Sequence, residues 1–113
     1  MQTGDESQGV VVLYTTWPDG GQAEAAAHQL LEERLIACAN VFPAGRSVFR
    51  WDGAVQAGAE TIALFKTSRT RAGAARARLI ELHPYDEPCV LALPADAGFS
   101  AAGFIQWVLA ETA

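Results

Sequence analysis

The stretch from Glu33 to Gly53 constrains the fold more than any other part of the sequence. Its first residues, 33–37, continue the spacing of a helix, and residues 47–51 are extended. The Pro43-Ala44-Gly45 segment separates these two parts. Asp52-Gly53 follows, which is a strong signal for a tight β-turn because glycine accepts positive φ without a steric penalty. A helix, a strand and a hairpin turn are therefore predicted within this one stretch.

Three apolar runs predict the other strands of a sheet. They span residues 10–16, 60–67 and 89–93, and they are apolar on both sides of the chain. This pattern is typical of strands that are covered on both faces. Ala57-Gly58 is expected to interrupt the extended course between the turn and the second of these runs.

Two helices are predicted between these strands. Residues 21–36 carry an apolar residue at every fourth position, and Asp19 with Gln22 has the spacing of a capping box. The second helix begins after Thr67 or Ser68, either of which can cap it. The predicted apolar stripes are Ala23, Ala27, Leu30, Leu31 and Leu35 in the first helix and Ala72, Ala75, Leu79 and Leu82 in the second.

The order of the elements predicts an α+β fold. Strand, helix, strand hairpin, helix and strand form the ferredoxin-like βαββαβ arrangement, an antiparallel sheet with two helices on one face. A C-terminal helix is added over residues 100–111, and it is uncharged up to residue 110. Because the strands are apolar on both sides, the second face of the sheet needs a cover, and large uncovered apolar surfaces mark association sites. A homo-oligomer in which the sheets of the subunits face one another is therefore expected.

Length and charge limit the partners. The chain has 113 residues, half of them hydrophobic, which suits a single domain over residues 9–113 after a flexible polar tail, residues 1–8. This tail lacks the pattern of a signal peptide. The net charge of −5 argues against nucleic acid, whose phosphates need a concentrated positive surface. The uncharged run 97–110 is too short to span a bilayer, so no membrane partner is expected.

Cys38 and Cys89 are the two cysteines of the chain. They have no short spacing that would indicate a disulfide framework or a zinc knuckle, and a reduced cytoplasmic setting is expected. Cys38 with His28 or His83 as a base could in principle form a nucleophilic pair. The apolar neighbours of both thiols favour a role in packing instead.

Five blocks of the sequence resemble the CutA divalent-cation tolerance proteins in order and spacing. The blocks are Tyr14-Thr15-Thr16-Trp17-Pro18-Asp19, Glu33-Arg34-Leu35-Ile36-Ala37-Cys38-Ala39-Asn40, Trp51-Asp52-Gly53, Leu64-Phe65-Lys66-Thr67 and Leu82-His83-Pro84-Tyr85-Asp86. The resemblance covers residues 10–109. It implies a ferredoxin-like subunit in a homotrimer similar in architecture to the PII signalling proteins. It also implies a link to tolerance of copper and other divalent metals.

The sequence departs from the family pattern at several positions. Ala54, Gln56 and Gly58 stand where members usually carry a lysine after the turn and acidic residues beyond it. Thr15 stands where some members have a cysteine that has been proposed as a copper ligand. Asp86 stands where a glutamate is often found. These departures leave the expected fold intact, but a copper site is not carried over whole.

His83, Asp86 and Glu87 form the best local cluster of metal-ligating residue types. Imidazole with carboxylate suits copper or zinc, but a closed transition-metal site wants about four ligands and one chain offers a single imidazole here. Weak binding of a divalent cation, completed by a neighbouring subunit, is therefore expected. In the alternative interpretation, His83 ends the helix and Tyr85 packs against it.

Arg50, Trp51, Lys66 and Tyr85 are expected to line a cleft between subunits. Their cations suit an anionic small molecule, by analogy with nucleotide binding in PII proteins. Alternatively, Arg50 and Lys66 pair with acidic groups on neighbouring strands. No nucleophile–base pair and no paired carboxylates stand in a recognisable spacing, so no catalytic residue is assigned and no cofactor is required.

Overall fold

The computed structural model describes residues 9–113, so the predicted polar tail, residues 1–8, lies outside the described residues. The sheet order is β2-β3-β1-β4, and each neighbouring pair is antiparallel. This is the predicted ferredoxin-like arrangement, which is thereby confirmed. The elements are β1 (Val10–Trp17), α1 (Gly20–Glu32), β2 (Cys38–Trp51), β3 (Ala54–Ser68), α2 (Arg69–Leu82), β4 (Val90–Pro94), the 3-10 helix η2 (Ala97–Phe99) and α3 (Ala102–Glu111).

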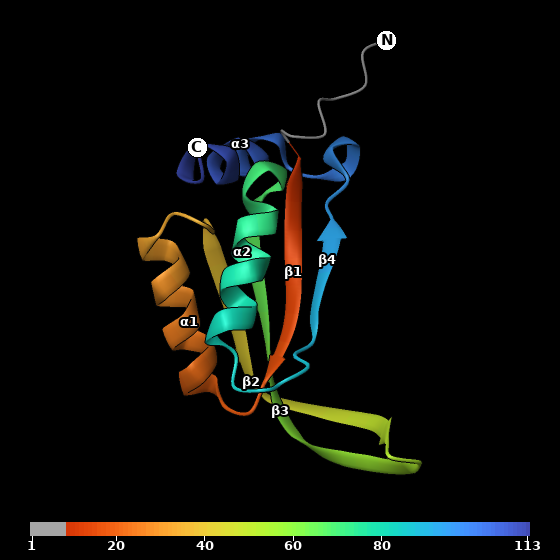
Figure 1. Cartoon of the computed structure of the whole chain (residues 1–113). Helices are drawn as coiled ribbons and strands as arrows, with labels where there is room; N and C mark the ends of the chain where they lie inside the picture. The colour runs from red at the N-terminus through yellow and green to blue at the C-terminus, as the bar shows by residue number, and fades with distance from the viewer. Residues whose placement is uncertain (1–8) are drawn as a thin grey trace.

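Two helices cover one face of the sheet, as Figure 1 shows for α1 and α2. The third helix, α3, lies across the end of the sheet at which β1 begins. At the opposite end, the hairpin formed by β2 and β3 extends past the other strands and bends away from them. We call its distal part, residues 46–58, the hairpin arm. No helix among residues 9–113 has the length and apolar character needed to cross a membrane.

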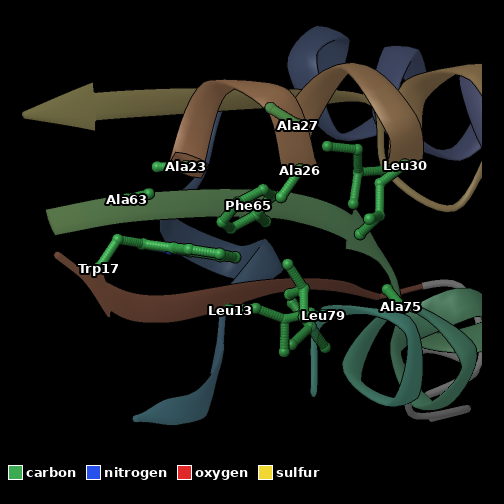
Figure 2. Close-up of a cluster of buried hydrophobic side chains, with 12 residues drawn as sticks. Leu13, Trp17, Ala23, Ala26, Ala27, Leu30, Ala63, Phe65, Ala75 and Leu79 are labelled. Carbon is green, nitrogen blue, oxygen red and sulfur yellow. The ribbon is translucent and has the colours of Figure 1, made fainter. Parts of the chain in front are cut away.

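The main core fills the space between the two helices and the sheet (Figure 2). Trp17 and Phe65 are fully buried there, with ring centroids 6.2 Å apart. The α1 side chains that face them are mostly alanines, which let the helix lie close to the strands. A second, smaller cluster holds α3 against the sheet through Val10, Ala37, Ile105 and Val108.

Helix α1 is shorter than predicted. Its cap is as expected, because the Asp19 carboxylate accepts a hydrogen bond from the Gln22 backbone N–H at 2.8 Å. It ends at Glu32, and Arg34 then takes a positive φ of 57°, which leaves the helical conformation. The predicted stripe is also partly wrong, because Leu31 is 41% exposed. A helix repeats every 3.6 residues, so steps of four rotate by about 40° each and move off the buried face. The buried α1 side chains are Ala23, Ala26, Ala27 and Leu30.

Helix α2 matches its prediction. The Ser68 side chain accepts a hydrogen bond from the Arg71 backbone N–H at 3.2 Å and so caps the first turn. Ala75 and Leu79 are buried against the sheet, and Ala72 and Leu82 pack at the edge of the same core.

The hairpin is more continuous than the sequence indicates. Pro43–Gly45 lies within β2 as an irregularity in the pairing with β3, and the predicted interruption at Gly58 is wrong because Gly58 pairs with Ser47. The turn is confirmed, with φ of 49° at Asp52 and 77° at Gly53. Gly45 lets β2 lie close to β3, since a Cβ at this position would lie 2.5 Å from the Glu60 carbonyl oxygen.

The second face of the sheet carries no helix over most of its length. Residues that alternate with Leu13 and Phe65 point to this side, and cross-strand pairing aligns Tyr14 with Leu64 and Leu91. We call this surface the open face. Its apolar side chains are Val12, Tyr14, Phe42, Ile62, Leu64, Leu91 and Leu93, and the same register places Thr16, Asn40 and Lys66 on this side. Phe42 and Leu91 are half exposed or more, so the apolar surface predicted from the strands is present in the single chain.

Candidate functional site

His83 ends α2 and is buried between two aromatic rings. Its imidazole stacks on Trp17 with ring centroids 4.1 Å apart and lies 4.8 Å from the Tyr85 ring. Nδ1 accepts a hydrogen bond from the Tyr85 backbone N–H at 3.1 Å, and Nε2 donates to the Thr16 carbonyl oxygen at 2.7 Å. Both ring nitrogens therefore have partners within the chain. A metal ion at His83 would have to displace one of these hydrogen bonds.

Asp86 and Glu87 lie in the exposed loop between α2 and β4. Among residues 9–113, no three side chains of His, Cys, Asp or Glu come together as a group that could hold a metal ion. A single chain thus does not assemble His83, Asp86 and Glu87 into a metal centre. The predicted weak site depends on ligands from outside the chain.

Thr15 is buried beneath the helices. Its hydroxyl donates to the Ala63 carbonyl oxygen at 2.8 Å and accepts from the Trp17 indole N–H at 2.6 Å. The hydroxyl is therefore used to satisfy the indole inside the core. This position contributes to packing and presents no ligand to a metal ion.

The four residues predicted for a cleft are spread along the molecule. Arg50 and Trp51 lie at the exposed end of the hairpin arm, whereas Lys66 lies in the main part of β3 with its ammonium 5.5 Å from the Phe104 ring of α3. Tyr85 lies in the loop after α2. The alternative interpretation is wrong, because neither Arg50 nor Lys66 forms an ion pair within the described part of the chain. One chain does not bring these four residues together.

A cavity of about 590 Å³ lies between the hairpin arm and the open face, and the sequence did not indicate it. Glu60 is its central polar group. The Ser47 hydroxyl donates to one carboxylate oxygen of Glu60, and the Tyr85 hydroxyl lies 3.4 Å from the other. Arg46 and Glu87 also line the cavity. In the sequence Glu60 is only the first residue of a predicted strand, because its partners come from distant positions.

Tyr85 has a raised pKa. Loss of hydration is the largest cause, followed by the negative charge of Glu60 and the hydrogen bond to it. All three disfavour the phenolate. The Tyr85 hydroxyl therefore stays protonated at neutral pH and acts as a donor toward Glu60.

The sheet order and the buried His83 at the end of α2 define a small ferredoxin-like subunit with a long hairpin arm. Residues 11–111 match the model of the CutA1 divalent ion tolerance protein family. The chain belongs to this family, which confirms the resemblance seen in the sequence. The family is named for tolerance of divalent ions and not for a catalysed reaction.

Individual relatives support the same assignment. The divalent-cation tolerance protein CutA of Pyrococcus horikoshii is 35% identical over 103 residues, which cover 91% of this chain and 98% of the relative. The crystal structure of CutA1 from Ehrlichia chaffeensis matches with a TM-score of 0.86 at 33% identity, covering 93% of this chain and 96% of that one. The periplasmic divalent cation tolerance protein CutA of Archaeoglobus fulgidus matches with a TM-score of 0.85 at 31% identity, covering 92% and 99%.

Proposed function

We propose that this protein serves tolerance of divalent cations as a non-enzymatic homotrimer that binds copper or zinc weakly. The observation that carries the proposal is membership of the CutA1 divalent ion tolerance family over residues 11–111. The absence of a recognisable nucleophile–base pair in the sequence agrees with a role that involves no catalysis.

The apolar open face supports assembly from several copies. Leu91 is 58% exposed and Leu93 is 48% exposed in the single chain, and both lie beside other apolar side chains of this face. Val48 and Trp51 on the hairpin arm are exposed as well. Contiguous apolar surface of this kind is removed from water when subunits associate. A trimer in which arms and open faces contact one another accounts for both surfaces.

Counting ligands supports weak metal binding shared between subunits. Asp86 and Glu87 offer exposed carboxylates three and four positions after His83 in the sequence, and the ring nitrogens of His83 already have partners. A closed transition-metal site needs about four ligands. A threefold assembly would turn one or two ligands per chain into a more complete set, at the cost of the hydrogen bonds that hold His83.

Calorimetric titration with Cu²⁺ and Zn²⁺ tests this proposal. We expect weak binding by the unmodified protein and its loss in the double variant Asp86→Asn, Glu87→Gln, which removes two exposed charges without touching the core. His83→Ala tests the imidazole, with thermal melting as a check that the fold survives. Glu24→Gln is the matched control, since Glu24 is an exposed carboxylate on α1. Equal metal affinity in all four proteins would contradict the site.

A cytoplasmic location forms part of the proposal. The two cysteines are free in the described structure, which agrees with a reducing compartment. Cell fractionation with an antibody to the protein tests it. Recovery in the periplasmic fraction would contradict this part of the proposal.

A second candidate function is that of a PII-like signal-binding module, which would hold an anionic small molecule between subunits through Arg50, Trp51, Lys66 and Tyr85. Arg50 favours it, because this exposed cation has no acidic partner within the described residues. Titration with ATP tests the alternative. Binding that is lost in Arg50→Gln but kept in Arg76→Gln, an exposed arginine on α2, would support it. Identical results for the two variants would argue against it.

A further inference from the structure

We draw no further inference here: the strongest candidate, the exposed face of α2 on which Arg69 and Arg76 flank Gly73 and Ala77, is a surface patch of the single chain, and nothing in the structure shows what covers it.

Discussion

The two faces of the sheet are built from the same strands but have opposite surroundings. On the helix-covered face, Leu13, Trp17 and Phe65 are exposed by 1% or less. On the open face, Leu91 and Leu93 keep about half of their surface exposed. Since burial of apolar surface is the main favourable term in folding, the covered face can stabilise the single chain. The open face and parts of the hairpin arm expose apolar side chains in the single chain, and the proposed trimer rests on this difference.

The largest expected loss of folding stability follows from a substitution on the helix-covered face. Trp17→Ala should lower the free energy of unfolding by about 3–5 kcal/mol, because it leaves a large cavity in the core. It also removes the ring on which His83 stacks. Chemical denaturation measures the loss. Trp51→Ala on the exposed arm is the matched control and should affect association instead. Similar losses of folding stability in both variants, with no effect on association, would remove the distinction between the two regions.

A charge introduced on the open face should weaken the association of subunits. Leu64→Asp places a carboxylate among apolar side chains of this face, and burying it unpaired in a subunit interface should cost about 3 kcal/mol. Sedimentation should then show smaller species at micromolar concentration. Leu31→Asp is the control, because Leu31 is exposed on α1 away from this face and should leave the assembly intact. An intact assembly with Leu64→Asp would contradict the assignment of the open face.

Loss of the α2 helix cap should lower folding stability without changing the oligomeric state. Ser68→Ala removes the side-chain oxygen that accepts from the Arg71 backbone N–H, at a cost of about 1 kcal/mol. The melting temperature should fall while the oligomeric state stays the same. Ser100→Ala, which changes an exposed serine after η2, should have a smaller effect. A change of oligomeric state in Ser68→Ala would show that the two regions are coupled.

The smallest expected effect is a change in the pH dependence of folding stability, caused by Tyr85 in the loop after α2. The pKa of Tyr85 is raised in the folded state, so the unfolded chain loses this proton first as pH increases. Protonated Tyr85 contributes fully to the stability of the folded state below about pH 10, the ordinary pKa of tyrosine. This contribution is lost as pH rises through the raised pKa of Tyr85. Melting temperature should therefore fall more steeply above pH 10 in the unmodified protein than in Tyr85→Phe. Equal slopes in the two proteins would contradict the raised pKa.

Local signals in the sequence predicted much of the fold. The Asp19 and Ser68 caps and the Asp52-Gly53 turn depend on neighbouring residues, and the structure contains all three. The end of α1 was predicted too late, because the positive φ of Arg34 leaves no clear mark in a sequence of helix-forming residues. The continuity of the hairpin was missed for a similar reason, since pairing with β3 overrides the local preference of Pro43-Ala44-Gly45.

The site was harder to predict because its contacts are long-range. Glu60 meets Ser47 across 13 positions and Tyr85 across 25, and His83 contacts Thr16 across 67. No spacing rule connects such residues before the strands are paired. The sequence singled out His83 and Tyr85 by residue type, and the Tyr85 backbone N–H that binds Nδ1 of His83 is two positions away, but the Thr16 carbonyl that binds Nε2 comes from the tertiary structure.

Sedimentation equilibrium of the unmodified protein tests the central claim most directly, namely that the open face is covered by other copies of the chain. At micromolar concentration we expect a single species with three times the mass of one chain. The mass should stay constant on dilution until the subunits dissociate and the apolar face becomes exposed. A folded, stable monomer over the same concentration range would contradict the account, because it would leave the apolar open face permanently in water.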